Sequence, residues 1–266
     1  MKYEYDKVKS WLKSKEHYLP GISELTQATS AEILVIGAAV FELYELQGWI
    51  TKLRRKTGDI DISIGLVNND IAYLKGKKFL KERNYRQDDI HLYRFHPEKV
   101  IPGGYAYIDL LAHPNNSSTS NAIAQNAMGV GPGFLFENFE YAKTNPYHLN
   151  DRFIFPNPFG FISLKMTSYL DEPLKRIKDF ADIVELINGL VETGNHFEIE
   201  SLWNKIKHKK ESLLLKKSIG KMKDHNDIGN WDLDIINDEL LKRNFNRDFI
   251  ENTLRARISD FYDQLI

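Results

Sequence analysis

One hexapeptide constrains the fold of this chain more than any other segment. Residues 59–64 read Asp-Ile-Asp-Ile-Ser-Ile, so polar and apolar side chains alternate without interruption. A period of two is typical of a β-strand, on which the three isoleucines share one face while Asp59, Asp61 and Ser63 share the other. The segment therefore predicts a strand with a core on one side and two neighbouring carboxylates on the other. A half-exposed strand that binds nothing has the same pattern, so the segment alone leaves both readings open.

The sequence around this strand predicts a mixed sheet with flanking helices. Hydrophobic periodicity and turn residues predict helices at 1–18, 38–47 and 68–83, the last with Asn68 as its cap. Short apolar or alternating runs predict further strands at 33–36, 91–95, 105–111 and 152–156.

Beyond Pro158 the periodicity is helical almost throughout. The Pro- and Asn-rich segment 145–157 is the best boundary, which gives domains at 1–156 and 157–266. The expected fold class is α+β, with a mixed-sheet N-terminal domain and an all-helical C-terminal domain.

Two further features surround the Asp-x-Asp strand. Gly37 and the small residues after it connect a strand to a helix, and backbone N–H groups at such a helix start let a phosphate approach closely. Asp109 is a single carboxylate in the apolar strand 107–111, where a charge needs either a ligand or a strand end facing water. Sites in which carboxylates share Mg²⁺ with substrate phosphates combine these features: two or three carboxylates on strands beside a turn that a phosphate can approach. We therefore predict a phosphate-plus-metal site with Asp59, Asp61 and Asp109 as metal ligands.

Two stretches, 35–39 and 55–61, together resemble the signature of the nucleotidyltransferase superfamily, which has the DNA polymerase β-like fold. That signature is a hydrophobic strand, Gly-Gly or Gly-Ser, a helix and then Asp-x-Asp, and Asp109 corresponds to its third carboxylate. The chain is most similar to the AbiEii/AbiGii-type toxins, which add a helical Lys and a Lys/Arg-Asp pair. Lys165 and Lys178-Asp179 match these. The resemblance covers roughly residues 30–190.

The resemblance implies transfer of a nucleoside monophosphate from an NTP to an acceptor, with two Mg²⁺ ions held by Asp59, Asp61 and Asp109. Asp109 would also accept the acceptor's proton, and Lys165 would contact the triphosphate and stabilise the leaving pyrophosphate. The implied nucleotide-binding residues are Gly37, Ala38, Arg55, Thr57, Lys165, Lys178 and Asp179. One departure is Ala38, which stands where the family has Gly or Ser and removes a hydroxyl that could bind phosphate.

Each of these helical residues also has a purely structural reading. Lys165 is flanked by apolar residues and could extend its ammonium to water from a half-buried face, while Lys178 and Asp179 could belong to a solvated surface. Eight lysines with one opposing glutamate lie between Lys205 and Lys223. They fit either a phosphate-binding surface for tRNA or another RNA, or a lysine-rich solvated helix. His91, His96 and His113 have no metal-ligand spacing, so we expect structural or surface roles for them.

Composition narrows the function classes. The chain has 266 residues, no cysteine and a formal charge of -1, which excludes disulfides and thiolate metal sites and requires any polyanion to bind a local patch. The N-terminus lacks a signal-peptide core and no apolar run approaches the ~20 residues of a bilayer span, so we expect a cytoplasmic protein without membrane contact.

Three functions remain open. The first is an Mg²⁺-dependent nucleotidyltransferase that modifies tRNA as a type IV toxin, with a cognate antitoxin. The second is a small-molecule nucleotidyltransferase of the aminoglycoside-resistance kind. The third is a nucleotide- or partner-binding module without turnover, which the missing hydroxyl at Ala38 favours.

Overall fold

The computed structural model describes residues 4–51, 57–65, 71–113, 146–149, 152–171, 175–196, 204, 232–254, 256, 257, 260 and 263. The chain divides into two compact units. One, here called the sheet unit, contains residues 2–47 and 56–157, and the other, the C-terminal unit, contains residues 48–55 and 158–266. Residues 48–55, which the sequence analysis grouped with the N-terminal domain, thus cluster with the C-terminal unit.

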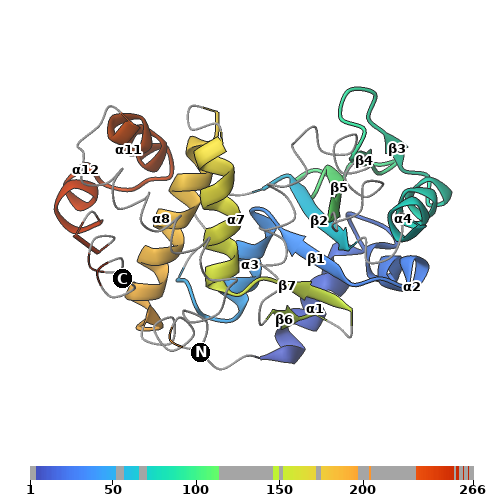
Figure 1. Cartoon of the computed structure of the whole chain (residues 1–266), viewed down its shortest axis with the longest axis horizontal. Coiled ribbons are helices and arrows are strands. Elements are labelled where there is room, and N and C mark those ends of the chain that lie inside the picture. The colour runs from blue at the N-terminus through green and yellow to red at the C-terminus, as the bar shows by residue number, and fades with distance from the viewer. Residues whose placement is uncertain are drawn as a thin grey trace. The chain divides into compact units, whose positions relative to one another are not determined.

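The sheet unit is a mixed α/β structure built on a seven-stranded sheet (Figure 1). The strand order is β3-β4-β5-β2-β1-β7-β6. β1 runs antiparallel to β2 and parallel to β7, while β2 runs parallel to β5. The elements are α1 (Tyr5–Lys15), η1 (Ile22–Glu24), α2 (Leu25–Thr29), β1 (Ile33–Ile36), α3 (Ala39–Leu46), β2 (Asp59–Gly65), α4 (Ile71–Glu82), β3 (Arg86–Gln87), β4 (Arg94–His96), β5 (Tyr107–His113), β6 (Tyr147–His148) and β7 (Phe153–Phe155).

The expected strands and helices of this half are confirmed, with shifts at their ends. One such shift is in β4, which begins at Arg94 instead of residue 91. The carboxylate of Asp88 accepts hydrogen bonds from the N–H groups of Ile90 and His91, and the carbonyl of His91 accepts one from Arg94. These bonds make residues 88–94 a turn and delay the strand. The expected cap Asn68 lies outside the described residues.

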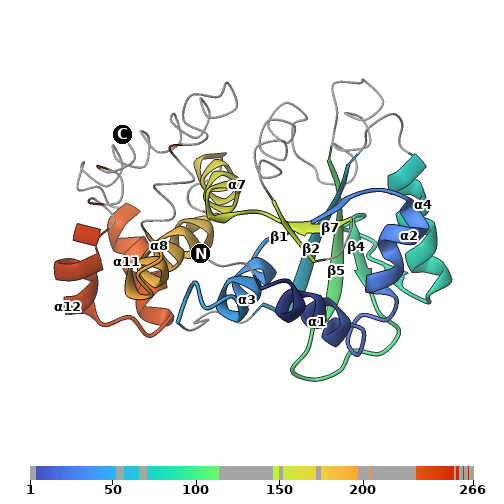
Figure 2. The same ribbon diagram turned by 90° about the horizontal axis from the view of Figure 1, so that it is seen from below.

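Helix α4 packs directly on the isoleucine face of the sheet. The Cα of Gly76 is so close to that face that a Cβ there would lie 2.9 Å from Ile64 and 3.4 Å from Leu110. Ile60, Ile62 and Ile64 are completely buried. Figures 1 and 2 both show α2 beside α4. Because side chains alternate along β2, the two carboxylates of the strand lie on the side of the sheet opposite α4.

A half-buried carboxylate holds α1 to the rest of the sheet unit. Glu42 of α3 accepts hydrogen bonds from Trp11 Nε1 at 2.8 Å, Lys15 Nζ at 2.6 Å and Tyr105 Oη at 2.6 Å. Burial alone raises the pKa of Glu42, but the hydrogen bonds from Lys15 and Tyr105 more than offset it, so the pKa lies below its usual value. The ionised Glu42 thus ties α1 and Tyr105, two residues before β5, to α3.

The elements described in the C-terminal unit are helices: α7 (Pro158–Asp171), α8 (Ile177–Glu192), α11 (Asp232–Lys242), the short α12 (Arg247–Phe249) and the π-turn η2 (Ile250–Leu254). α8 packs against both α7 and α11 and lies between them in Figure 1. Residues 179–190 of α8 are all buried, including charged ones that the next section describes. None of the described helices is long and apolar enough to cross a membrane.

Candidate metal centre

Three carboxylates meet on the polar face of β2 and β5. The two parallel strands place Asp61 opposite Asp109 and Asp59 opposite Tyr107. One oxygen from each of Asp59, Asp61 and Asp109 lies within 4.8 Å of the others, and this is the one such group of potential metal ligands among the described residues. Asp109 is 5% exposed, and Asp59 and Asp61 are half-buried. The sequence-predicted ligands are therefore brought together by the strand register.

The turn after β1 passes directly against this group. Gly37 has φ +69°, a backbone conformation that favours glycine, and a Cβ on it would lie 1.8 Å from Asp61 Oδ2. The sequence analysis explained Gly37 by the approach of a phosphate. The structure gives a nearer reason, because the Asp61 carboxylate fills the space that a side chain would take. Ala38 then precedes α3 without a side-chain cap.

Asp59 is oriented by two hydroxyl groups. Thr57 Oγ1 donates a short hydrogen bond to Asp59 Oδ1, and Tyr107 Oη donates one of 3.3 Å to Asp59 Oδ2. Burial, together with the charge of Asp59, raises the pKa of Tyr107 to about 12. Tyr107 therefore keeps its proton at neutral pH and acts as a donor to Asp59. Thr57, for which nucleotide binding remains a prediction, contacts a metal-ligand candidate.

Arg94 holds the third carboxylate with both arms of its guanidinium group. It lies opposite Asp109 on β4, and its Nε and Nη2 donate to Asp109 Oδ1 and Oδ2 at 2.9 Å each. The guanidinium also stacks on the Tyr107 ring, with Cζ 3.8 Å from the ring centroid. Arg94 therefore offsets one negative charge of the group and occupies both oxygens of Asp109. The sequence analysis missed Arg94, although a charged residue next to buried Phe95 in an expected strand was a usable signal.

Two more polar residues extend this face of the sheet. His96 Nε2 lies 3.2 Å from Asp88 Oδ2, and the His96 ring contacts the edge of Tyr107. Ser63, two residues beyond Asp61 on β2, is 1% exposed, and its Oγ has no hydrogen-bond partner among the described residues. The polar face thus runs from a His–Asp pair, across the carboxylates, to a buried hydroxyl. The His96 contact agrees with the structural role expected for it.

Lys165 of α7 and Asp179 of α8 form an ion pair inside the C-terminal unit. Lys165 Nζ lies 2.6 Å from Asp179 Oδ1 and 2.8 Å from Asp182 Oδ2, and Ser168 Oγ donates to Asp179 at 2.7 Å. Burial alone would lower the pKa of Lys165. The charges of Asp182 and Asp179 raise it by more than burial lowers it, so the ammonium stays charged. Lys165 does not extend to water as the structural reading suggested, because its charge is neutralised by two buried carboxylates.

Arg243 extends this network from α11's end. Its Nη1 lies 2.8 Å from Asp182 Oδ1 and 3.0 Å from Glu185 Oε2, while Nη2 donates to the Lys178 carbonyl at 3.0 Å. Lys178 enters the network only through this backbone group, since its side chain is exposed. The sequence analysis gave no role to Asp182 or Arg243. The spacing of Asp179, Asp182 and Glu185 at three-residue intervals placed all three on one helix face.

The remaining sequence-predicted positions cannot be placed. Arg55 and the lysines from Lys205 to Lys223 lie outside the described residues.

Comparisons of the chain with models of protein families, with curated proteins and with solved structures found no match. The function is therefore inferred from the geometry of the chain itself. The Asp59–Asp61–Asp109 group could hold a metal ion, and its donors are all carboxylate oxygens, which hard cations such as Mg²⁺ prefer.

Proposed function

We propose that the chain is an Mg²⁺-dependent nucleotidyltransferase of the AbiEii/AbiGii type, with an α+β nucleotidyltransferase-like domain and an all-helical C-terminal domain. In this proposal it transfers a nucleoside monophosphate from an NTP to tRNA or another RNA, as a toxin with a cognate antitoxin. One observation carries the proposal: carboxylates from two adjacent parallel strands converge within 4.8 Å. The turn that contacts them joins a strand to a helix at Gly37.

The charge and chemistry of the group fit divalent cations. Three carboxylates and the guanidinium of Arg94 sum to -3 + 1 = -2 among the described side chains. Asp59, Asp61 and Asp109 would hold Mg²⁺, which when bound neutralises the triphosphate and lowers the pKa of the acceptor hydroxyl. Thr57 and Tyr107 support this role because they fix Asp59 from the side by hydrogen bonds.

The chain's own residues then handle the proton and the leaving group. The acceptor oxygen forms a bond to the α-phosphorus while the bond from that phosphorus to the bridging oxygen breaks, and pyrophosphate leaves with the electron pair. Asp109, which Arg94 orients through its guanidinium group, takes the proton of the acceptor hydroxyl. The resemblance assigns Lys165 to the leaving pyrophosphate, a role for which its ammonium must exchange the contacts with Asp179 and Asp182 for phosphate oxygens. Gly37, Ala38, Arg55 and Lys178 complete the nucleotide-binding set.

Label transfer tests the proposal. The wild-type chain is incubated with each α-³²P-labelled NTP, Mg²⁺ and total RNA, next to an Asp59→Ala/Asp61→Ala variant. We expect labelled RNA from the wild type and none from the variant. A matched control, Asp6→Ala/Asp89→Ala, removes two exposed carboxylates elsewhere and should label RNA normally. Absence of labelled RNA with all four NTPs would contradict the proposal.

A second candidate is a nucleotide-binding module without turnover. Arg94 occupies both oxygens of the carboxylate that would accept the proton, and this observation favours it. It predicts that NTP is retained in a filter-binding assay, in an Asp59- and Asp61-dependent manner, while neither RNA nor an aminoglycoside becomes labelled. Labelled acceptor of either kind would eliminate the second candidate.

A further inference from the structure

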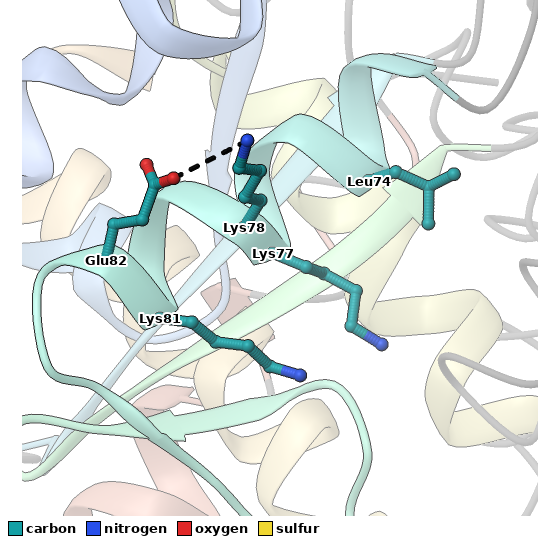
Figure 3. Close-up of a pocket in the computed structure, with 5 residues that line it drawn as sticks. All are labelled: Leu74, Lys77, Lys78, Lys81 and Glu82. Atoms are coloured by element: carbon teal, nitrogen blue, oxygen red, sulfur yellow. Dashed lines mark ion pairs between the residues drawn. The ribbon is translucent and has the colours of Figure 1, made fainter.

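Helix α4 carries a basic hollow on the side away from the sheet. The hollow has a volume of about 600 Å³ and is lined by Leu74, Lys77, Lys78, Lys81 and Glu82 (Figure 3). Leu74 is 55% exposed, so the hollow is open to solvent. We call Lys77, Lys78 and Lys81 the α4 lysine surface.

The positive charge of this helix is a local excess. Ile71–Glu82 contains four lysines and one glutamate, which sum to 4 - 1 = +3. The whole chain has a formal charge of -1, so the other residues together carry -4. An excess of this kind within three helical turns creates an attractive potential for anions that the total charge conceals.

The lysines of this surface are incompletely neutralised. Lys78 lies 3.6 Å from Glu82, and Figure 3 shows it turned toward that carboxylate. Lys77 and Lys81 extend from the same side of α4 in the figure, and neither has an ion pair among the described residues. Burial, and secondarily the charge of Lys81, lowers the pKa of Lys77. Two like charges four residues apart destabilise a helix slightly, and a bound anion between them would remove this repulsion.

We propose that the α4 lysine surface binds the phosphate backbone of a nucleic acid. The inference goes beyond the proposed function and is independent of catalysis, because α4 packs on the isoleucine face while Asp59 and Asp61 lie on the other side of the sheet. Lys77 and Lys81 are separated by about 6 Å along the helix axis, at 1.5 Å per residue. Phosphates of one strand follow each other every 3.4 Å along a duplex, so Lys77 and Lys81 are about two phosphate intervals apart, a distance that three successive phosphates cover.

The residue types favour a nucleic acid over an acidic protein. Protein–protein interfaces are depleted in lysine and enriched in aromatic residues and arginine. Lysine instead contacts phosphate as a point charge that tolerates varied geometry, and protein–nucleic acid interfaces are strongly positive. A surface made of Lys77, Lys78 and Lys81 around one leucine therefore matches sequence-independent backbone binding.

Salt-dependent RNA binding tests the inference. The probe is a 5′-fluorescein-labelled, mixed-sequence, single-stranded 20-mer RNA, titrated by anisotropy at 50–300 mM KCl with EDTA and without NTP. For single strands the slope of log K against log[salt] is about 0.7 per phosphate contact, so Lys77→Gln/Lys78→Gln/Lys81→Gln should flatten the slope by about 2. The same relation gives an approximately 100-fold loss of affinity at 0.1 M KCl.

Two further variants control for the fold and for bulk charge. Lys7→Gln/Lys9→Gln/Lys13→Gln removes three exposed lysines from α1 and should leave the slope nearly unchanged. Glu82→Gln releases Lys78 from its exposed ion pair and should tighten RNA binding about two- to fivefold. Far-ultraviolet circular dichroism establishes that each variant folds.

Three outcomes would overturn the inference. The first is a wild-type salt slope in a folded α4 triple variant, and the second is an equal loss of RNA affinity in the α1 variant. The third is lysine-dependent binding of polyglutamate that is tighter than binding of RNA, which would indicate an acidic protein partner. Failure of the transferase proposal is distinguishable. If the Asp59→Ala/Asp61→Ala variant binds RNA normally but the wild type transfers no label, only the transferase proposal is refuted.

Discussion

Gly37→Ala is the substitution whose cost the structure defines best. The backbone at Gly37 has φ +69°, and a residue with a Cβ pays about 1–2 kcal/mol in this region. The new methyl would also lie 1.8 Å from Asp61 Oδ2 and 2.8 Å from Asp61 Cγ. Displacing the carboxylate from this packed position adds about 1–3 kcal/mol. We expect a total loss of about 2–5 kcal/mol in the free energy of unfolding.

Gly48 offers a matched control for the backbone term. It also has φ +69°, but no heavy atom lies within 4 Å of a Cβ built on it. Gly48→Ala should therefore show only the conformational cost of about 1–2 kcal/mol. The difference between the two alanine variants isolates the clash with Asp61.

A double-mutant cycle in urea, followed by tryptophan fluorescence in EDTA, completes the test. In an Asp61→Ala background Gly37→Ala should cost no more than Gly48→Ala, which corresponds to a coupling of about 1–3 kcal/mol between the two positions. Because Gly37→Ala moves a candidate ligand, it should also weaken Mn²⁺ binding measured by electron paramagnetic resonance. Additive free energies, or equal losses in the two glycine variants, would refute the reasoning.

Three other substitutions have defined outcomes. Glu42→Gln should lower stability by about 2 kcal/mol at pH 7. Since the folded pKa of Glu42 is lowered, this contribution is fully present above the unfolded value of 4.5 and is lost as pH falls through the folded pKa. The urea midpoints of variant and wild type should therefore converge as pH falls below 4.5. Arg94→Gln removes a positive charge and frees the Asp109 carboxylate, so it should tighten Mn²⁺ binding about tenfold. Arg94→Lys should change the Mn²⁺ affinity little. Unchanged affinity in the glutamine variant would mean that Arg94 and the metal do not compete for Asp109. Arg243→Met leaves buried carboxylates without their cation and should cost about 3–5 kcal/mol in the free energy of unfolding. Lys242→Met, whose side chain is 74% exposed, should be near neutral in thermal unfolding.

The local elements of the sheet unit were predictable because their signals are contained in short windows. The alternation in 59–64 predicts β2, and the buried run 33–36 predicts β1. The shared location of Asp59 and Asp61 follows from the same alternation. Their convergence with Asp109 depends on the parallel pairing of β2 with β5, which connects residues 48 positions apart. That register is a tertiary property, and only the resemblance to the nucleotidyltransferase superfamily predicted that Asp109 would join Asp59 and Asp61.

The environment of the charged helical residues was not predictable from their neighbours in sequence. Lys165 has apolar neighbours, and its partners Asp179 and Asp182 come from the next helix. Arg243 lies 61 residues beyond Asp182. An isolated charge in a helical pattern is compatible with both a solvated surface and a buried pair, and only packing distinguishes them. Arg94 was missed for the same reason, because its partner depends on cross-strand register.

The pairing of β2 with β5 has a consequence for how the sheet reaches one unique arrangement. The isoleucine face repeats the same side chain every two residues, so a slide of two residues would return isoleucine to most positions and keep that face apolar. The polar face is less degenerate, because a slide in one direction would put Ser63 in the place of Asp61 against Gly37, and a slide in the other would put Asp59 there and Thr57 in the place of Asp59. The same carboxylates that would bind metal thus mark the correct alignment of the strands. If apolar residues replaced them, we expect the sheet to populate more than one strand register before it loses folding stability.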